Sequence, residues 1–523
     1  MIIFNILLFL VVLGGIILIH EFGHFYFAIK AGILVHEFAI GMGPLVYGKR
    51  GKDDILYAVR GIPIGGYVSM AGEEVSDALI KKGQKIGLQL NADGFVDEIH
   101  TMGVEDQQVI GVVKDYDLYG KSKADLYVTL TVNDQDVTYQ VIRTCKYILK
   151  NNQYMKVTPE ELSFESKTLW QRFLTIFGGP LMNFVLAFVL YLFVAFFVFQ
   201  PQLDSNKIGD VIDGYPASSV GIVAGDKITS INGVTVNDWN DLGDITSDLV
   251  SHIVDVEVEK ENGTVESYED VSLAVVIQTG GFSNVDENGE ITGGIAQTFG
   301  RAQEAGLSEY DVIYELSQGT IIQDINDFDD VIAFFQTVNA GDVTVKYYAN
   351  GSDAQTLTYT ILSESALSKL GYEPIAFQFG ITATTSFNLG YSLLYPFKMI
   401  GNNVSQVYQT LGLLLSPNED IGLSDLSGPI GIFTLVSRTS SQGLLAILAF
   451  TAFLSINIGI LNLLPIPALD GGRLVFLAYE AVTKKRLSRK LENTVNMVMF
   501  YALMILFVYV TYHDILRIIR GLI

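Results

Sequence analysis

Two histidines and a glutamate stand together at the end of the first apolar stretch of the chain. Residues 1–24 are almost wholly apolar and end in the motif HEFGH, in which His20 and His24 flank Glu21. Positions i and i+4 of a helix share one face, so both imidazoles can bind one Zn²⁺, with Glu21 beside them as a general base. This spacing predicts a zinc centre that activates water for hydrolysis.

The third zinc ligand must come from elsewhere, because a catalytic zinc usually takes three protein ligands and leaves one position open. Asp470 is the candidate. It follows Asn462 and two prolines, which end an apolar stretch, and it begins the next helical run while still close to the apolar zone. The other histidines show no ligand spacing and are expected at the surface or in packing: His36, His100, His252 and His513.

The element that must position the motif is a transmembrane helix at residues 1–30. Its apolar run is long enough to span hydrocarbon, and it lacks the basic start and the small-residue cleavage site of a removable signal peptide. Ionisable side chains are costly within a bilayer, so their presence indicates a functional site. The alternative is a helix end whose polar side chains reach the headgroups, which would require a chance match to the whole motif in a chain with six histidines.

Composition places the chain among membrane proteins of several domains: it has 523 residues, of which 49% are hydrophobic. The net charge of −24 lies entirely in residues 201–380, which hold 30 Asp+Glu and 6 Lys+Arg (6 − 30 = −24). Such a balance excludes nucleic acid as a partner and indicates a solvated, extracytoplasmic block. The single cysteine, Cys145, excludes an intrachain disulfide and is expected to be a packing residue.

Three further transmembrane helices are expected, at residues 169–199, 443–480 and 495–516, the second of which carries Asp470 in an LDG motif. In the first of them, Gly178-Gly179-Pro180 permits close helix contact, and Asn183 has either a scaffold or a site-lining role. Basic residues are concentrated between positions 25 and 172 and again after Asp470. The positive-inside rule therefore makes these segments cytoplasmic and both termini extracytoplasmic.

Two membrane-associated regions and a soluble insert are expected between the spans. Residues 31–74 predict a β hairpin containing Gly65, Gly66 and Tyr67, which is either an ordinary surface hairpin or one that dips toward the zinc and holds a substrate segment as an added strand. Residues 75–165 predict a small β-rich cytoplasmic insert without a catalytic constellation. Residues 385–440 are apolar but interrupted, which favours helices lying on the outer interface.

The acidic block contains two related units. Residues 203–280 give a short helix, a tight Gly-Asp turn and a strand closed by Asn-Gly, an order that resembles a bacterial PDZ domain. Residues 281–365 repeat it in degenerate form, with Tyr310 in place of the expected glycine. Such domains bind peptide ends by strand addition. The alternative is a spacer that only excludes bulky proteins.

Taken together, HEFGH in a first span, the tandem PDZ-like insert and the run from Asn462 to Gly472 resemble the bacterial site-2 proteases of the regulator of sigma-E protease type. The resemblance covers nearly the whole chain, and the 75–165 insert is similar to that of Gram-positive members. It implies an intramembrane zinc metalloprotease that cuts single-pass membrane proteins, such as anti-sigma factors or remnant signal peptides, in regulated intramembrane proteolysis. The roles it implies are zinc binding by His20, His24 and Asp470, water activation by Glu21, and substrate contact by Asn462 and the hairpin residues Gly65, Gly66 and Tyr67.

The fold expected is therefore a polytopic α-helical membrane protein with four transmembrane helices, extracytoplasmic tandem PDZ-like α+β domains and a cytoplasmic β-rich insert. A rival interpretation is a membrane-anchored PDZ adaptor with a structural metal site. A closed structural site would need four protein ligands, and the sequence offers three candidates. A metal transporter would need more intramembrane polar residues along a pathway than these spans contain.

Overall fold

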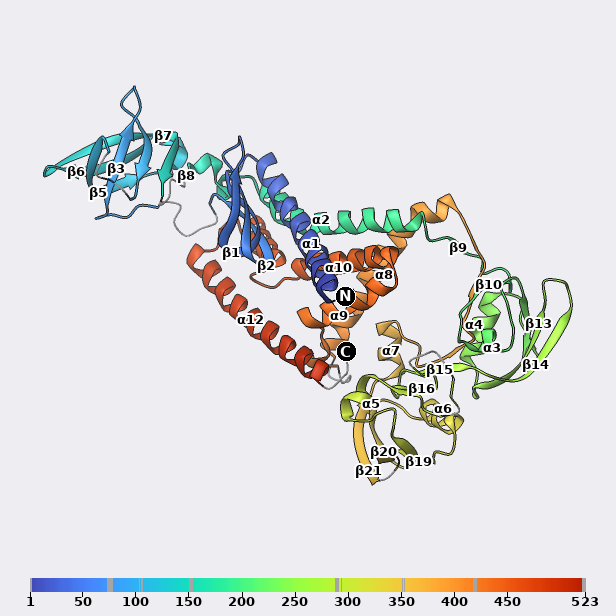
Figure 1. Ribbon diagram of the computed structural model, residues 1–523. Coiled ribbons are helices and arrows are strands. Elements are labelled where there is room, and N and C mark those ends of the chain that lie inside the picture. Colours follow the sequence, from blue (N-terminus) through green and yellow to red (C-terminus); the bar gives the residue numbers. More distant parts are fainter. Residues whose placement is uncertain are drawn as a thin grey trace. The chain divides into compact units, whose positions relative to one another are not determined.

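The computed structural model describes residues 2–72, 79–102, 104, 107–149, 154–286, 291–292, 294–349, 351, 353–416 and 421–519 (Figure 1). The chain forms two compact units, and each is described by itself. Unit 1 is Met1–Leu190 with Ala449–Met504, and unit 2 is Tyr191–Leu448 with Ile505–Ile523. Parts of three predicted regions lie outside the described residues. Residues 73–78 join the predicted hairpin region to the predicted insert. The others are residues 287–290, 293, 350 and 352 of the second predicted PDZ-like unit and residues 417–420 of the predicted interfacial region.

Four helices in the described part of the chain are long and apolar enough to cross a membrane. They are α1 (Ile2–Lys30), α2 (Leu169–Ala195), α10 (Leu444–Leu463) and α12 (Arg489–Ile519). The four spans expected from the sequence are thus present as helices of suitable length and hydropathy. The region predicted at 443–480 is divided, because α10 ends before Pro465 and Pro467 and a separate helix, α11 (Asp470–Thr483), begins at the aspartate.

A long two-stranded hairpin follows α1 directly. It consists of β1 (Val35–Arg50) and β2 (Leu56–Met70), which pair antiparallel with several register shifts. Its base packs on the end of α1 through a small apolar cluster that includes Ala28, Ile33 and Val68. The hairpin is therefore anchored only a few residues after HEFGH.

The predicted β-rich insert forms a small closed sheet. The strand order is β4-β3-β5-β6-β7-β8, and β4 also pairs in parallel with β7, so five of the strands close on themselves. Closure removes free strand edges that could otherwise pair with other chains. Cys145 is fully buried in the core of this sheet, as expected of a packing residue. The strands are β3 (Lys85–Leu90), β4 (Val96–His100), β5 (Val109–Asp117), β6 (Leu126–Val132), β7 (Gln135–Ile148) and β8 (Tyr154–Lys156).

Unit 2 contains two sheets of the same design. In the first, β11 (Lys227–Ile231) lies between β12 (Val234–Thr235) and β13 (Ile253–Glu259), with β14 (Val265–Ser272) outside. The second repeats that order with β18 (Val312–Gln318), β19 (Ile321–Asp324), β20 (Gly341–Ala349) and β21 (Asp353–Ile361). A helix with an aspartate N-cap follows the short strand in each: α4 (Trp239–Ser247) after Asp238 and α6 (Phe328–Thr337) after Asp327.

The second repeat is inserted within the first. After it, β22 (Ile375–Gln378) pairs with β15 (Ala274–Ile277), and β23 (Ile381–Ala383) pairs with β10 (Ile208–Val211). Two strands beyond residue 365 therefore complete the repeat that the sequence analysis bounded at 203–280. Pairing between segments about a hundred or more residues apart leaves no local pattern, which is why the sequence alone did not indicate it.

The remaining helices of unit 2 are α8 (Leu389–Leu414) and α9 (Pro429–Ser441), which lie in the region predicted as interfacial helices. α8 continues through Pro396, and its Asn403 donates to the hydroxyl of Tyr191 (2.6 Å). The first backbone N–H groups of α9 have no partner within the helix. The buried carboxylate of Asp514 on α12 is such a partner. It accepts hydrogen bonds from the N–H of Gly431 (2.9 Å) and from the N–H of Gly428 just before the helix (3.2 Å). The short helices and strands of unit 2 are α3 (Pro216–Ser219), α5 (Gly300–Ala305), α7 (Glu364–Leu370), β9 (Gln200–Pro201), β16 (Phe282–Ser283), β17 (Gln297–Thr298) and β24 (Thr385–Ser386).

Candidate metal centre

Three potential metal ligands from the two ends of the chain meet in unit 1. Nε2 of His20 and Nε2 of His24, both on α1, lie 3.2 and 3.3 Å from Oδ2 of Asp470, the first residue of α11. The two imidazole nitrogens are 3.2 Å apart. Both histidines are 8% exposed, so the cluster is largely shielded from solvent. Of the described residues, this is the one group of three His, Cys, Asp or Glu side chains close enough to hold a metal ion together.

The three separations match the chemistry of zinc. A tetrahedral ion with bonds of about 2.0 Å keeps its ligand atoms about 3.3 Å apart, so these donors correspond to one face of a tetrahedron. Oδ2 of Asp470 is buried and makes no hydrogen bond with any described residue, although two ring nitrogens lie beside it. A buried carboxylate oxygen in that position is suited to a cation held among the three donors. The fourth position of such an ion would be open for water or substrate.

A tight turn places Asp470 at the cluster. Ala468 has a left-handed backbone (φ 73°), and its N–H donates to Oδ1 of Asn496 on α12 (3.1 Å). Gly471 and Gly472 follow the aspartate against the chain that precedes it. A Cβ on Gly471 would lie 2.1 Å from the carbonyl oxygen of Leu464, and one on Gly472 would lie 2.5 Å from that of Ile466. The two glycines after Asp470 are therefore required by the close return of the backbone.

A glycine contact brings α1 and α2 together beside the histidines. A Cβ on Gly23 would lie 2.0 Å from the carbonyl oxygen of Gly178, and one on Gly179 would lie 2.3 Å from Nε2 of His24 and 2.8 Å from Nε2 of His20. Residues with side chains would not fit at these positions. Gly178-Gly179-Pro180 was recognised in the sequence as a site of close helix contact, but its direct contact with the imidazoles was not.

Each imidazole also has a partner on α2. Nδ1 of His24 lies 2.8 Å from the carbonyl oxygen of Thr175, and Nδ1 of His20 lies 3.3 Å from Nδ2 of Asn183. Both rings thus turn Nε2 toward Asp470. The contact of Thr175 is made by its backbone, so no side-chain pattern could have revealed it.

The hairpin reaches Glu21 through Gly66. A Cβ on Gly66 would lie 3.1 Å from Cγ of Glu21 and 2.9 Å from the carbonyl oxygen of Ala39, so this strand passes closely over the glutamate. Gly65 has φ 82°, which favours glycine. Tyr67 lies beside Arg60 and Glu37, which form a bidentate ion pair (2.6 to 2.8 Å). Burial and the hydrogen bond to Glu37 raise the pKa of Tyr67 to about 12.

The other predicted site residues and histidines have separate surroundings. Asn462 lies in the last turn of α10, and its side-chain amide donates to the carbonyl oxygen of Ile458 in the same helix (3.1 Å). His100 pairs with Glu98 (3.0 Å), and His252 pairs with Asp329 (2.6 Å). His36 lies 3.4 Å from the hydroxyl of Thr158, and the ring centroid of His513 is 4.6 Å from that of Tyr509. These four histidines are outside the donor cluster, as the sequence analysis expected.

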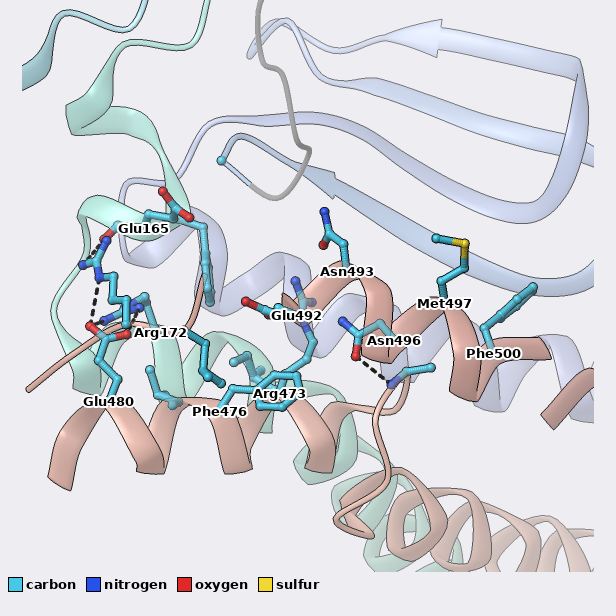
Figure 2. A pocket seen from close by; sticks show the side chains of 17 residues that line it. Glu165, Arg172, Arg473, Phe476, Glu480, Glu492, Asn493, Asn496, Met497 and Phe500 are labelled. Carbon is cyan, nitrogen blue, oxygen red and sulfur yellow. Dashed lines mark hydrogen bonds and ion pairs between the residues drawn. The ribbon is translucent and has the colours of Figure 1, made fainter. Parts of the chain in front are cut away.

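A cavity of about 500 Å³ adjoins the turn that carries Asp470. Figure 2 shows the ion pair of Arg172 and Glu480 (2.6 Å) at one end and the side chains of Met497 and Phe500 at the other. The ion pair links the first turns of α2 to the last turns of α11. The cavity extends to Ala468, two residues before Asp470, whereas the three donor residues themselves do not line it.

Comparisons with known proteins agree with the chemistry of the cluster. The model of peptidase family M50 matches residues 8–506. The chain is 31% identical over 516 residues to zinc metalloprotease RasP of Shouchella clausii, covering 98% of both proteins. It is also 31% identical over 519 residues to the probable protease Eep of Enterococcus faecalis, covering 98% of this chain and 99% of that protein. A putative zinc metalloprotease of Staphylococcus aureus is 28% identical over 522 residues, with 98% of both proteins covered.

Proposed function

Since the chain belongs to peptidase family M50, the site-2 proteases, we propose that its hydrolytic centre lies where α1 meets the start of α11. The protein is an intramembrane zinc metalloprotease, and its substrates are membrane proteins. The observation that carries the location of the centre is the cluster of three donor atoms 3.2 to 3.3 Å apart on membrane-spanning and adjacent helices. A metal held by three ligands with one open position favours catalysis over the structural site of an adaptor.

In this proposal His20, His24 and Asp470 hold the zinc. When bound, zinc polarises a peptide carbonyl and lowers the pKa of water toward about 7. Glu21 takes a proton from the attacking water and later delivers it to the leaving amine. Its place beside the histidines, on the helix turn that also contacts Gly66, supports this role.

The hairpin and Asn462 are proposed to hold the substrate. A helical substrate has its carbonyl oxygens in i to i−4 hydrogen bonds, so cleavage requires local unwinding. The closeness of Gly66 to Glu21 supports a role for the strand that includes Gly65 and Tyr67 in holding the unwound segment by strand addition. Exposed apolar side chains on β1, including Val46 (69% exposed) and Tyr47 (64%), suit contact with lipid. The cavity beside Ala468 offers room for the flank of that segment.

We further propose that both termini and the two acidic repeats are extracytoplasmic and that the repeats are PDZ-like modules that receive peptide ends. The shared strand order of the repeats and their N-capped helices support this assignment. Residues 25–172, which include the insert, hold 17 of the 33 Lys+Arg of the chain, and this concentration supports the cytoplasmic location of the insert. Single-pass proteins such as anti-sigma factors and remnant signal peptides are the proposed natural substrates.

The Glu21→Gln protein tests the proposed centre. Purified in detergent, it should retain zinc but cut a model transmembrane substrate at least about 100-fold more slowly, because a general base contributes that much or more. His100→Gln is the matched control, since it removes a histidine of the insert outside the cluster, and it should keep both zinc and activity. Undiminished cleavage by Glu21→Gln would eliminate Glu21 as the base.

A further inference from the structure

Asn183 of α2 adjoins His20 on the side away from the other ligands. Its side chain is fully buried, and its amide nitrogen lies 3.3 Å from Nδ1 of His20. His24 has a corresponding neighbour, since its Nδ1 lies 2.8 Å from the carbonyl oxygen of Thr175. Each zinc ligand of α1 is thus contacted from behind by α2, at positions two turns apart.

The two contacts differ in their chemistry. An imidazole that binds a metal through Nε2 carries its hydrogen on Nδ1 and donates it to an oxygen. Thr175 offers His24 such an oxygen. Asn183 has one too, because its Oδ1 is buried without a hydrogen-bond partner among the described residues. Rotation of the amide by 180° about Cβ–Cγ exchanges oxygen and nitrogen with little change in shape.

We propose that Asn183 is a positioning residue for the zinc ligand His20: its Oδ1 accepts the Nδ1–H of the imidazole and thereby fixes Nε2 as the metal-binding nitrogen. This inference rests on the proposed function. In the opposite orientation the amide would donate to Nδ1, and the ring hydrogen would then sit on Nε2. There it would point at Oδ2 of Asp470, 3.2 Å away, and block coordination. The orientation of one amide therefore decides which nitrogen of His20 is available.

The backbone of Asn183 is held independently of its side chain. Its carbonyl oxygen accepts from the hydroxyl of Ser455 on α10 (2.9 Å). A Cβ on Gly459, one turn later, would lie 3.3 Å from Cβ of Asn183, so α10 packs closely at this residue. The contact with α10 and the contact with His20 can therefore be removed one at a time.

Zinc affinity measured by competition with a chromophoric chelator tests the inference. Full-length protein in detergent is used, with Glu21→Gln in every variant so that no self-cleavage occurs. Asn183→Leu removes the acceptor and should weaken zinc binding by roughly 10- to 100-fold. Asn183→Asp keeps the size and the acceptor but removes the donor, and it should bind zinc as tightly as its parent. Ser455→Ala is the matched control, because it removes a contact of Asn183 that does not reach the imidazole, and its affinity should be unchanged.

Two results would overturn the inference. One is unchanged zinc affinity in an Asn183→Leu protein whose thermal unfolding shows that it is folded. The other is an Asn183→Asp protein whose zinc affinity falls as far as that of Asn183→Leu, because the amide nitrogen would then be the atom that positions His20. If Asn183→Leu does not fold, the zinc affinity of Asn183→Asp is compared with that of Ser455→Ala instead, and a clearly weaker affinity of Asn183→Asp overturns the inference. A parent protein that takes up no zinc would contradict the proposed function instead.

Discussion

Gly179 is the residue at which the smallest change should disturb the donor cluster. Substitution Gly179→Ala would place a methyl group 2.3 Å from Nε2 of His24, a distance that real Cβ atoms essentially never show, so the helices or the imidazoles must move. We expect the purified variant to lose most of its zinc, measured as metal content per protein.

Gly15→Ala is the control for this prediction. Gly15 lies on α1 just over one turn before His20, and a Cβ there would meet nothing within 4 Å. The change should keep zinc and, because alanine favours helix by about 1 kcal/mol, leave the helix at least as stable. Equal zinc content in the two variants would show that the α1–α2 contact does not control the site.

Single residues of the site were predictable where the chemistry lies in the side chain. His20, Glu21 and His24 share a spacing that suits zinc binding on one helix face and rarely arises by chance in an apolar span, and Asp470 stands where prolines interrupt an apolar run. The contacts of Gly179 and Thr175 were not predictable, because they arise from the distance between two helix backbones. Asn183 was recognised as polar and membrane-embedded, but the sequence could not indicate which atom it faces.

At the scale of elements, the hairpin is attached to the insert as well as to α1. Asp54, in the turn between β1 and β2, pairs with Lys156 of β8 (2.7 Å) and accepts from the hydroxyl of Tyr154 (2.5 Å). The guanidinium of Arg50 lies 4.0 Å over the ring of Tyr154. The insert thus holds the turn of the hairpin whose strand passes over Glu21. The strands of the insert were predictable from their alternation, whereas this contact between the hairpin turn and β8 was not.

His36 of β1 should make the stability of this contact between the hairpin and the insert depend on pH. Burial, with the nearby charges of Arg50 and Lys156, lowers the pKa of His36 to about 4. The folded protein therefore favours neutral His36. The contribution of this histidine to the free energy of unfolding is complete above its unfolded pKa of about 6.5, and it is lost as the pH falls from 6.5 toward 4.

We expect the thermal midpoint of wild-type protein to fall more steeply than that of His36→Gln between pH 6.5 and 4.5. The difference corresponds to about 1–3 kcal/mol, since one pH unit changes the free energy of unfolding by at most about 1.4 kcal/mol per group. Parallel pH profiles for the two proteins would contradict the assignment. His100→Gln serves as the comparison for a histidine already paired with a carboxylate.

At the scale of the whole molecule, the inserted second repeat can be removed without breaking a strand of the first. Ile277 of β15 and Ile375 of β22 are direct partners in an antiparallel pair, so a two-residue Asn-Gly turn can replace residues 278–374. If the second repeat only limits access by size, cleavage of a substrate with a bulky folded domain should increase while that of a short substrate stays unchanged.

Zinc content of the shortened protein is the control, because the donor cluster lies wholly in unit 1. Slower cleavage of the short substrate would instead favour peptide binding by this repeat. The sequence indicated that two related units exist, but not that one interrupts the other.

The three donors of the cluster are synthesised at very different times during translation. His24 and Asp470 are 446 positions apart (470 − 24 = 446), so a ribosome that has delivered the imidazoles must still produce the closed sheet of the insert, both repeats and α10 before the carboxylate emerges. Every chain that has not yet reached residue 470 lacks one of the three donors. On the proposed ligand set, we therefore expect a nascent chain without Asp470 to be inert toward the proteins being inserted around it, and the enzyme to become competent only near the completion of its own translation.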